Sequence, residues 1–346
     1  MERFYFDANA TTPPLPAVVE AETMAMRLAW ANPTSTHQEG QFARNLLEEA
    51  RREVAGALGV PPSQLVFCAS ATEALHLLIR GLQPSLGARP ALVFPGEHSA
   101  CLNPLRDWAE VRWLPDGLPE AATVVQMAAS NETGIRYAMP VVPGAVRIMD
   151  ADQAWGKVPV DLGDCDAAVF SGHKIGGHRG VGVLWLGPEL PWTPIMEGPQ
   201  ERRRRGGTED LPAILGLEQA VRALPERLAG SAALAPLRDA LEDEVLGWSA
   251  DYAAIGRGLP RLPNTSSLLL RGHGGEATQI ALDLAGFAVS TGSACHSGAT
   301  KPSHAVTTLG YSEAEARSVI RISMLPGTTQ REVEGLLAAL KRILKR

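Results

Sequence analysis

The chain has 346 residues, of which 45% are hydrophobic and 20% charged, and its formal net charge at pH 7 is −6. This length suits a large domain with a smaller companion, because single cores stop growing near ~250–300 residues, and the negative charge argues against nucleic acid as the main partner. No apolar stretch approaches the ~20 residues of a membrane-spanning helix and the first residues do not resemble a secretory leader, so we expect a cytoplasmic protein.

Seven short apolar runs predict β-strands in the first half of the chain. They cover residues 65–68, 91–94, 111–114, 123–127, 146–149, 167–170 and 182–186. Nearly continuous apolar runs are typical of strands buried on both faces, so we expect an α/β fold with a mainly parallel seven-stranded sheet covered by helices. The last strand follows its neighbour after a short loop, which allows it to run antiparallel.

Helices are predicted between and after these strands. Residues 45–58 carry apolar side chains at helical spacing and stop before a glycine and two prolines. Residues 212–224 and 236–248 each begin with a proline, which the first turn of a helix tolerates, and Pro225 is expected to end the first of these two helices.

The last third of the chain predicts a smaller α+β unit. Strands are expected at 266–270, 287–290 and 319–323, with helices between them, and a final helix at 330–346 has one apolar stripe that is typical of core packing. We therefore predict a large domain over 14–250 and a small domain made of 1–13 and 251–346.

Two groups that carry charge follow consecutive strands of the predicted sheet. Asp150 comes after the strand at 146–149, and Lys174 comes after the strand at 167–170. Ligands of open parallel sheets gather at the carboxyl ends of the strands, so both residues are expected at one site. A third strand ends at Ser70 and Thr72 and turns directly into a helix, whose N-terminus suits a phosphate, although both residues would also serve as ordinary N-caps.

The protein contributes three groups to a pyridoxal phosphate site: a lysine that can form an imine with the cofactor, a carboxylate at a strand end and a phosphate-binding turn. The carboxylate keeps the ring nitrogen protonated, so that the ring accepts electrons when a bond to the substrate's Cα breaks. His98 follows the strand at 91–94 and offers an imidazole face at the same edge. A surface lysine and a loop histidine remain the ordinary alternatives for Lys174 and His98.

The four cysteines lie far apart and show no spacing typical of a metal site, so no metal is expected. Cys68, Cys101 and Cys165 fit buried apolar positions. Cys295 differs, because it lies in a loop of Gly, Ser, Thr and His after a predicted strand. Its thiol is expected to be accessible and nucleophilic as the thiolate, with an exposed but unreactive cysteine as the alternative.

Two further patterns do not support other functions. The glycine-rich run at 176–182 leads into a strand, whereas a dinucleotide-binding fingerprint leads into a helix. The four arginines at 202–205 form a short run in an acidic protein, so we interpret them as an anion-facing or solvated loop instead of a nucleic-acid patch.

Taken together, ten short motifs resemble the cysteine desulfurases of the class V aminotransferase group, which are fold-type I pyridoxal phosphate enzymes. The motifs occur in the family's order at residues 5–13, 31–37, 70–73, 96–98, 131–134, 150–153, 171–174, 206–208, 292–295 and 320–323. The chain departs from the family pattern at 176–178 and 197–199, where Gly-Gly-His and Glu-Gly-Pro replace the usual residues, which leaves the choice of substrate and sulfur acceptor open.

The resemblance implies a role for each matching residue. Lys174 would hold the cofactor covalently and move protons, and Asp150 and Gln153 would pair with the ring nitrogen and the ring hydroxyl. Thr72, Ser171 and His173 would bind the phosphate, with Thr208 from the second subunit. His98 would stack on the ring and serve in proton transfer. Arg321 would bind the substrate carboxylate, helped by Asn131, which would also contact the cofactor.

The resemblance also implies a reaction and partners. Cys295 would attack the sulfur of L-cysteine, carry it as a persulfide to an acceptor protein and leave L-alanine, in a homodimer that binds neither membrane nor nucleic acid. The pathway served, whether iron–sulfur cluster assembly, thiolation or another, stays open. Two alternatives also stay open: a selenocysteine lyase or another class V enzyme, and a catalytically silent relative that binds a partner.

Overall fold

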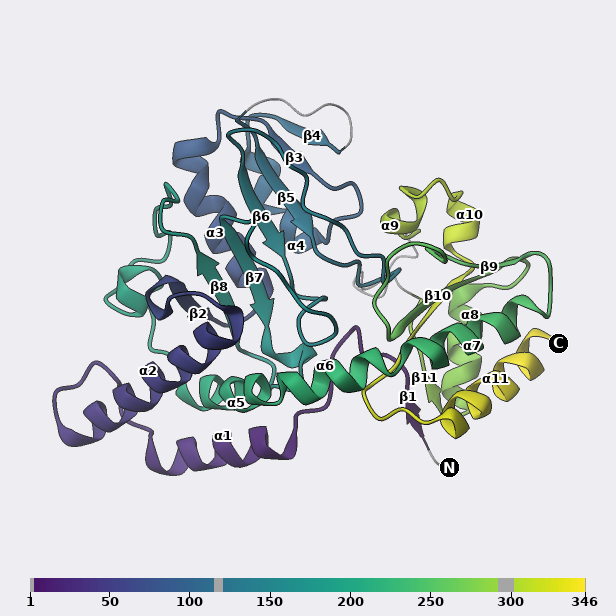
Figure 1. Ribbon diagram of the computed structural model, residues 1–346, viewed down its shortest axis with the longest axis horizontal. Coiled ribbons are helices and arrows are strands. Elements are labelled where there is room, and N and C mark those ends of the chain that lie inside the picture. Colours follow the sequence, from purple (N-terminus) through teal and green to yellow (C-terminus); the bar gives the residue numbers. More distant parts are fainter. Residues whose placement is uncertain (1–2, 115–120, 292–301, 346) are drawn as a thin grey trace.

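The computed structural model describes residues 3–114, 121–291 and 302–345. A seven-stranded sheet forms the centre of the larger half (Figure 1), with the strand order β2-β8-β7-β6-β5-β3-β4. Its strands are β2 (Leu65–Cys68), β3 (Ala91–Val93), β4 (Val111–Trp113), β5 (Thr123–Met127), β6 (Val146–Asp150), β7 (Ala167–Ser171) and β8 (Gly182–Leu186). Strand β8 runs antiparallel to both neighbours, and all other pairs are parallel. The predicted fold class and all seven predicted strands are confirmed.

Helices cover both faces of this sheet. Helices α1 (Pro16–Leu28), α2 (Gln38–Leu58) and α5 (Leu211–Arg222) pack on one face, and α3 (Ala71–Leu86) and α4 (Ser99–Leu102) pack on the other. Within β7, Ala168 and Phe170 face the first group while Ala167 and Val169 face the second. Both side-chain rows of the strand are therefore buried, which explains its continuous apolar sequence.

A run of helices leads from the large sheet to the smaller half of the molecule (Figure 1). It consists of α5, α6 (Leu224–Ala232) and α7 (Ala235–Leu246). We expected Pro225 to end a helix, but it lies in the first turn of α6. The backbone N–H groups of a first turn have no partner within the helix, so the N–H that proline lacks is not missed there. Leu241 and Val245 of α7 pack in the core of the small sheet.

The smaller half contains two separate sheets. Strands β9 (Tyr252–Ala254), β10 (Thr265–Leu270) and β12 (Val319–Ser323) form an antiparallel sheet, whereas β11 (Phe287–Ala288) pairs in parallel with β1 (Phe4–Tyr5). The strand predicted at 287–290 is thus shorter than expected and joins the chain's first strand. The division into domains over 14–250 and over 1–13 with 251–346 stays a prediction.

The remaining elements are short or peripheral. They are α8 (Gly275–Leu284), α9 (His304–Thr307), α10 (Glu313–Ala316) and α11 (Gln330–Leu344), with 3-10 turns η1 (Pro62–Gln64), η2 (Pro104–Asp107), η3 (Gly172–Lys174) and η4 (Glu201–Arg203). Helix α11 confirms the predicted final helix, and its buried residues Val333, Leu336 and Leu340 pack in the core of the small sheet.

Candidate active site

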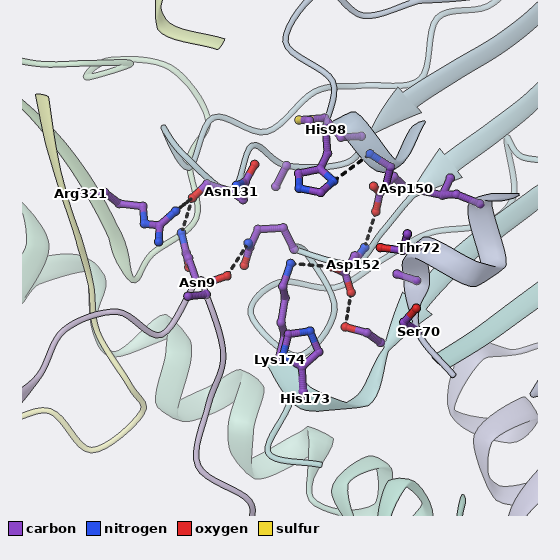
Figure 2. Close-up of a pocket in the computed structure, with 18 residues that line it drawn as sticks. Asn9, Ser70, Thr72, His98, Asn131, Asp150, Asp152, His173, Lys174 and Arg321 are labelled. Atoms are coloured by element: carbon purple, nitrogen blue, oxygen red, sulfur yellow. Dashed lines mark hydrogen bonds and ion pairs between the residues drawn. The ribbon is translucent and has the colours of Figure 1, made fainter. Parts of the chain in front are cut away.

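A cavity of about 300 Å³ opens where the parallel strands of the large sheet end and the smaller half begins. Figure 2 shows its lining residues, which come from the loops after β2, β3, β5, β6 and β7 and from the small unit. Nine of the predicted site residues line it: Thr72, His98, Asn131, Asp150, Gln153, Ser171, His173, Lys174 and Arg321. Thr208 lines a different cavity, beside Arg205 and Cys68. Cys295 lies outside the residues that the structure describes.

Lys174 enters the cavity from η3, the short turn that directly follows β7. Its Nζ lies 2.5 Å from Oδ2 of Asp152. Its backbone carbonyl accepts a hydrogen bond of 2.9 Å from Nη2 of Arg227 on α6. Only 14% of the Lys174 side chain is exposed. The lysine is therefore held at both its backbone and its amine, and it is not the surface lysine of the ordinary alternative.

Two carboxylates, Asp150 and Asp152, lie side by side at the end of β6. The backbone N–H of Asp152 donates to Oδ1 of Asp150 over 3.0 Å. Burial, with the charge of Asp152, raises the pKa of Asp150 to about 6. Asp152 is buried as well, but the charge of Lys174 and hydrogen bonds from Lys174 and Ser171 outweigh burial and lower its pKa to about 2. A further positive charge beside Asp150 would therefore stabilise its ionised form.

His98 caps the N-terminus of α4, and the residue before it is buried. Its Nδ1 accepts a hydrogen bond of 3.2 Å from the backbone N–H of Ala100. The preceding residue, Glu97, is fully buried and its carboxylate accepts from the backbone N–H of Met127, while burial raises its pKa well above the usual value. These contacts hold the imidazole at the edge of the cavity (Figure 2).

The N-terminus of α3 offers unused hydrogen-bond donors to the cavity. Ser70 accepts from the backbone N–H of Glu73 over 3.1 Å, and the carboxylate of Glu73 accepts from the N–H of Ala69 over 2.6 Å. Within the described parts of the chain, no residue accepts from the backbone N–H groups of Ala71 and Thr72. Thr72 lines the cavity, and free N–H groups at the start of a 16-residue helix bind phosphate.

Arg321 of β12 forms the opposite wall of the cavity. Its Nη1 donates to the carbonyl of Asn131 over 3.0 Å, and its Nη2 lies 2.6 Å from Oδ1 of Asp7. Its Nε is buried and finds no acceptor among the described residues. A buried guanidinium with an unused N–H group suits a carboxylate ligand.

Three residues of the site escaped the sequence analysis: Asp152, Lys157 and Asn9. The amine of Lys157 is buried and donates to Oδ1 of Asn9 over 2.9 Å and to the side-chain oxygen of Gln153. Burial lowers the pKa of Lys157 well below the usual value. Asp152 and Lys157 lie within eight residues of Asp150, so the density of charged residues in an otherwise apolar segment was the available signal.

The cavity fits pyridoxal phosphate on three observations of the chain itself. A lysine amine lies in its wall, a buried aspartate with a raised pKa matches the protonated ring nitrogen, and the free N–H groups of α3 match the phosphate.

Among the residues described, no group of three His, Cys, Asp or Glu side chains could hold a metal ion. None of the helices described is long and apolar enough to cross a membrane.

Comparison with known proteins gives matches over nearly the whole length of the chain. Residues 4–336 match the family described as aminotransferase class-V. A cysteine desulfurase of Cereibacter sphaeroides is 35% identical, over 99% of this chain and 96% of the relative. An IscS-like cysteine desulfurase of Mycobacterium tuberculosis is 34% identical, over 97% and 95%. A solved NifS-like protein has a TM-score of 0.89 and 28% identity, over 99% of both chains.

Proposed function

The chain belongs to the class-V aminotransferase family, as a pyridoxal phosphate-dependent cysteine desulfurase, and we propose the following roles for its residues. When bound, the cofactor supplies an electron sink for the bonds broken at the substrate. Lys174 holds it covalently, and Asp150 pairs with the ring nitrogen. The pairing is supported by the raised pKa of Asp150, because a neighbouring cation would stabilise the charge that burial disfavours.

Gln153 is proposed to donate to the ring hydroxyl, and its neighbours support this orientation. The Nε2 of Gln153 donates to the backbone carbonyl of Asn9 over 3.1 Å. A carbonyl can only accept, so the side-chain oxygen of Gln153 must face Lys157, which donates to it. The amide NH2 carries two N–H groups, so one is left for an acceptor beside the one that binds Asn9.

The phosphate is proposed to bind at the start of α3, on the N–H groups of Ala71 and Thr72 and on the Thr72 hydroxyl. His173, whose Nδ1 lies 3.0 Å from Oγ1 of Thr11, and Ser171 complete this end of the cavity. The hydroxyl of Ser171 already donates to Asp152, so we assign it a smaller share of the phosphate than Thr72.

The carboxylate of L-cysteine is proposed to bind Arg321 and Asn131. The unused Nε–H of Arg321 and the position of both residues on the wall opposite α3 support this assignment. His98, at the edge of the cavity, is proposed to stack on the ring and to assist proton transfer. Its Nδ1 accepts from Ala100, which leaves Nε2 to carry the proton.

Cys295 is proposed as the nucleophile, acting as its thiolate. Its sulfur forms a bond to the substrate's sulfur, the Cβ–S bond of the substrate breaks with its electron pair left on Cβ, and protonation of the carbon gives alanine. The described residues on either side support delivery to the cavity. Ser290 pairs through its backbone with Arg321, and Ser303 donates to the buried carboxylate of Glu132.

We further propose a homodimer in which Thr208 reaches the phosphate of the second subunit. Thr208 does not line the cavity of its own chain. An exposed apolar face on and after α1 supports self-association, since Trp30 is 72%, Leu28 62% and Met26 60% exposed.

The persulfide would pass to an acceptor protein, with iron–sulfur cluster assembly as one pathway that would use it. Buried, unpaired thiols at Cys68, Cys101 and Cys165 suit a reducing compartment such as the cytoplasm.

The observation that carries this proposal is the meeting of Lys174, Asp150, Thr72 and Arg321 in one cavity. The test compares Cys295→Ser with the wild type, with alanine and sulfide measured from L-cysteine in the presence of a thiol reductant. We expect the variant to bind pyridoxal phosphate normally but to release neither product. Unchanged release of alanine by the variant would refute the persulfide route.

A further inference from the structure

Asp152 lies between two residues that the proposed function assigns to the cofactor. Its Oδ2 is 2.5 Å from Nζ of Lys174, and its Oδ1 accepts the hydroxyl proton of Ser171. Both the aspartate and the lysine are 14% exposed. An ion pair shielded in this way is weakened little by salt, so the carboxylate acts strongly on the lysine nitrogen.

The surroundings of Asp152 set it apart from its neighbour Asp150. Four other titratable groups near this pair are His173 on the same turn as Lys174, Lys157 after β6, Arg227 of α6 and Asp150 itself. Asp152 is ionised more readily than usual and Asp150 less readily. Adjacent carboxyl groups with pKa values pushed apart take different tasks in a reaction.

We propose that Asp152 is a catalytic residue, which contacts the amine of Lys174 and stabilises its ammonium form during proton transfer. The inference rests on the proposed function, because it takes Lys174 as the lysine of the cofactor. In the proposed step, the free amine of Lys174 takes the proton from Cα of the substrate. When bound, the cofactor would supply the electron sink for the C–H bond that breaks, and Asp152 neutralises the ammonium that forms on Lys174.

The carboxylate stays ionised throughout, and the ammonium later returns its proton to carbon, so no outside acid or oxidant is required. An opposite charge within ~4–6 Å stabilises a cation, and the contact of 2.5 Å places the Asp152 carboxylate well inside that range of the Lys174 nitrogen. Removal of the charge should therefore slow the proton transfer while leaving the binding of substrate to Arg321 intact.

The test uses the holoenzyme of Asp152→Asn, a variant of nearly the same size whose Oδ1 can still accept from Ser171. The absorbance of the bound cofactor is titrated with pH, because the titrating nitrogen is that of Lys174. We expect the midpoint to fall by about one unit or more. The kinetic isotope effect with Cα-deuterated cysteine should rise, because the proton transfer becomes more rate-limiting. A residue with a merely structural role would change neither quantity.

Two further variants make the result specific. Asp166→Asn removes a carboxylate at the opposite end of β7 and should leave both quantities at the wild-type level. Asp152→Glu keeps the charge and should hold the midpoint within about half a unit of wild type, and this variant decides the matter if Asp152→Asn does not fold. An unchanged midpoint and isotope effect in Asp152→Asn, or a lowered midpoint in Asp152→Glu, would overturn the inference. Absence of alanine formation by the wild type would instead refute the proposed function.

Discussion

Lys157 places its amine 2.9 Å from Oδ1 of Asn9, and the same amine donates to the side-chain oxygen of Gln153. Asn9 in turn donates through Nδ2 to the carbonyl of Asn131, which also accepts from Arg321. One buried lysine therefore connects the residue proposed for the ring hydroxyl with the residues proposed for the substrate carboxylate. This network suggests that Lys157 positions both ends of the site.

Replacement of Lys157 by methionine tests this network. The variant leaves the side-chain oxygen of Gln153 without the Lys157 donor and leaves Oδ1 of Asn9 with the longer bond of 3.3 Å from Asn264, and an unsatisfied buried group costs about 1–3 kcal/mol. We expect the dissociation constant of pyridoxal phosphate, measured by absorbance titration of the apoprotein, to rise about tenfold. Lys341→Met is the control, because that lysine is 44% exposed on α11. Equal dissociation constants in the wild type, Lys157→Met and Lys341→Met would show that Lys157 does not position the cofactor site.

Asp150→Asn should stabilise the protein without cofactor while abolishing turnover. The pKa of Asp150 is raised from 3.8 to about 6 in the folded state, so folding favours its protonated form. The free energy of unfolding therefore falls as the pH rises through about 4 to 6, by roughly 3 kcal/mol if the whole shift is expressed.

The check on Asp150 is thermal unfolding of the two apoproteins at pH 7.5 and pH 4. The variant should have the higher Tm at pH 7.5, and the difference should be much smaller near pH 4, where Asp150 is protonated in the folded state and about half protonated in the unfolded state. Asp161→Asn, at an exposed position, is the control and should change the Tm at neither pH. A lower Tm for Asp150→Asn at pH 7.5 would contradict the raised pKa.

Arg321→Lys should weaken the binding of L-cysteine more than the chemical step. A lysine keeps the charge but loses the planar fork and the Nε–H group. Hydrogen bonds between charged groups contribute about 1.5–3 kcal/mol, so the KM for cysteine should rise about 10–100-fold with a smaller change in kcat. Arg317→Lys, at an exposed residue after α10, provides the comparison. A large loss of kcat at unchanged KM would place Arg321 outside the carboxylate site.

Charge placed on the exposed apolar face near α1 should prevent dimer formation. The double variant Leu28→Glu and Trp30→Glu puts two carboxylates at positions that are 62% and 72% exposed. Sedimentation velocity should show a monomer. Its rate of alanine formation from L-cysteine should be low, because Thr208 of the second subunit would be absent from the phosphate site. Leu284→Glu, on the exposed side of α8, should remain a dimer. An active dimer of the double variant would show that another surface is used.

The large sheet was predictable because its inner strands are buried on both faces and its helices are marked by glycine and proline; the edge strand β4 is exposed. The pairing of strands that lie far apart in the chain was not predictable from the sequence. Strand β11 joins β1, and no local pattern in residues 287–290 indicates that partner. The helix boundary at Pro225 was misjudged for a local reason, because a proline is common both after the end of one helix and in the first turn of the next, where Pro225 lies.

The site was predictable where strand ends carry single polar residues, as at Asp150 and Lys174. It was not predictable where a side chain acts through others. Lys157 looks like a surface lysine in the sequence, and its hydrogen-bond acceptor Asn9 lies far away in the chain. Asp152 was overlooked beside Asp150 because spacing alone does not show which carboxylate faces the lysine.

The bond between Lys174 and pyridoxal phosphate can be tested most directly by reduction of the holoenzyme with borohydride, followed by proteolysis and mass spectrometry of the peptides. The account predicts that the reduced cofactor is found on the peptide that contains Lys174, with none on Lys157. A label on Lys157 or on another residue, or no label at all, would contradict it.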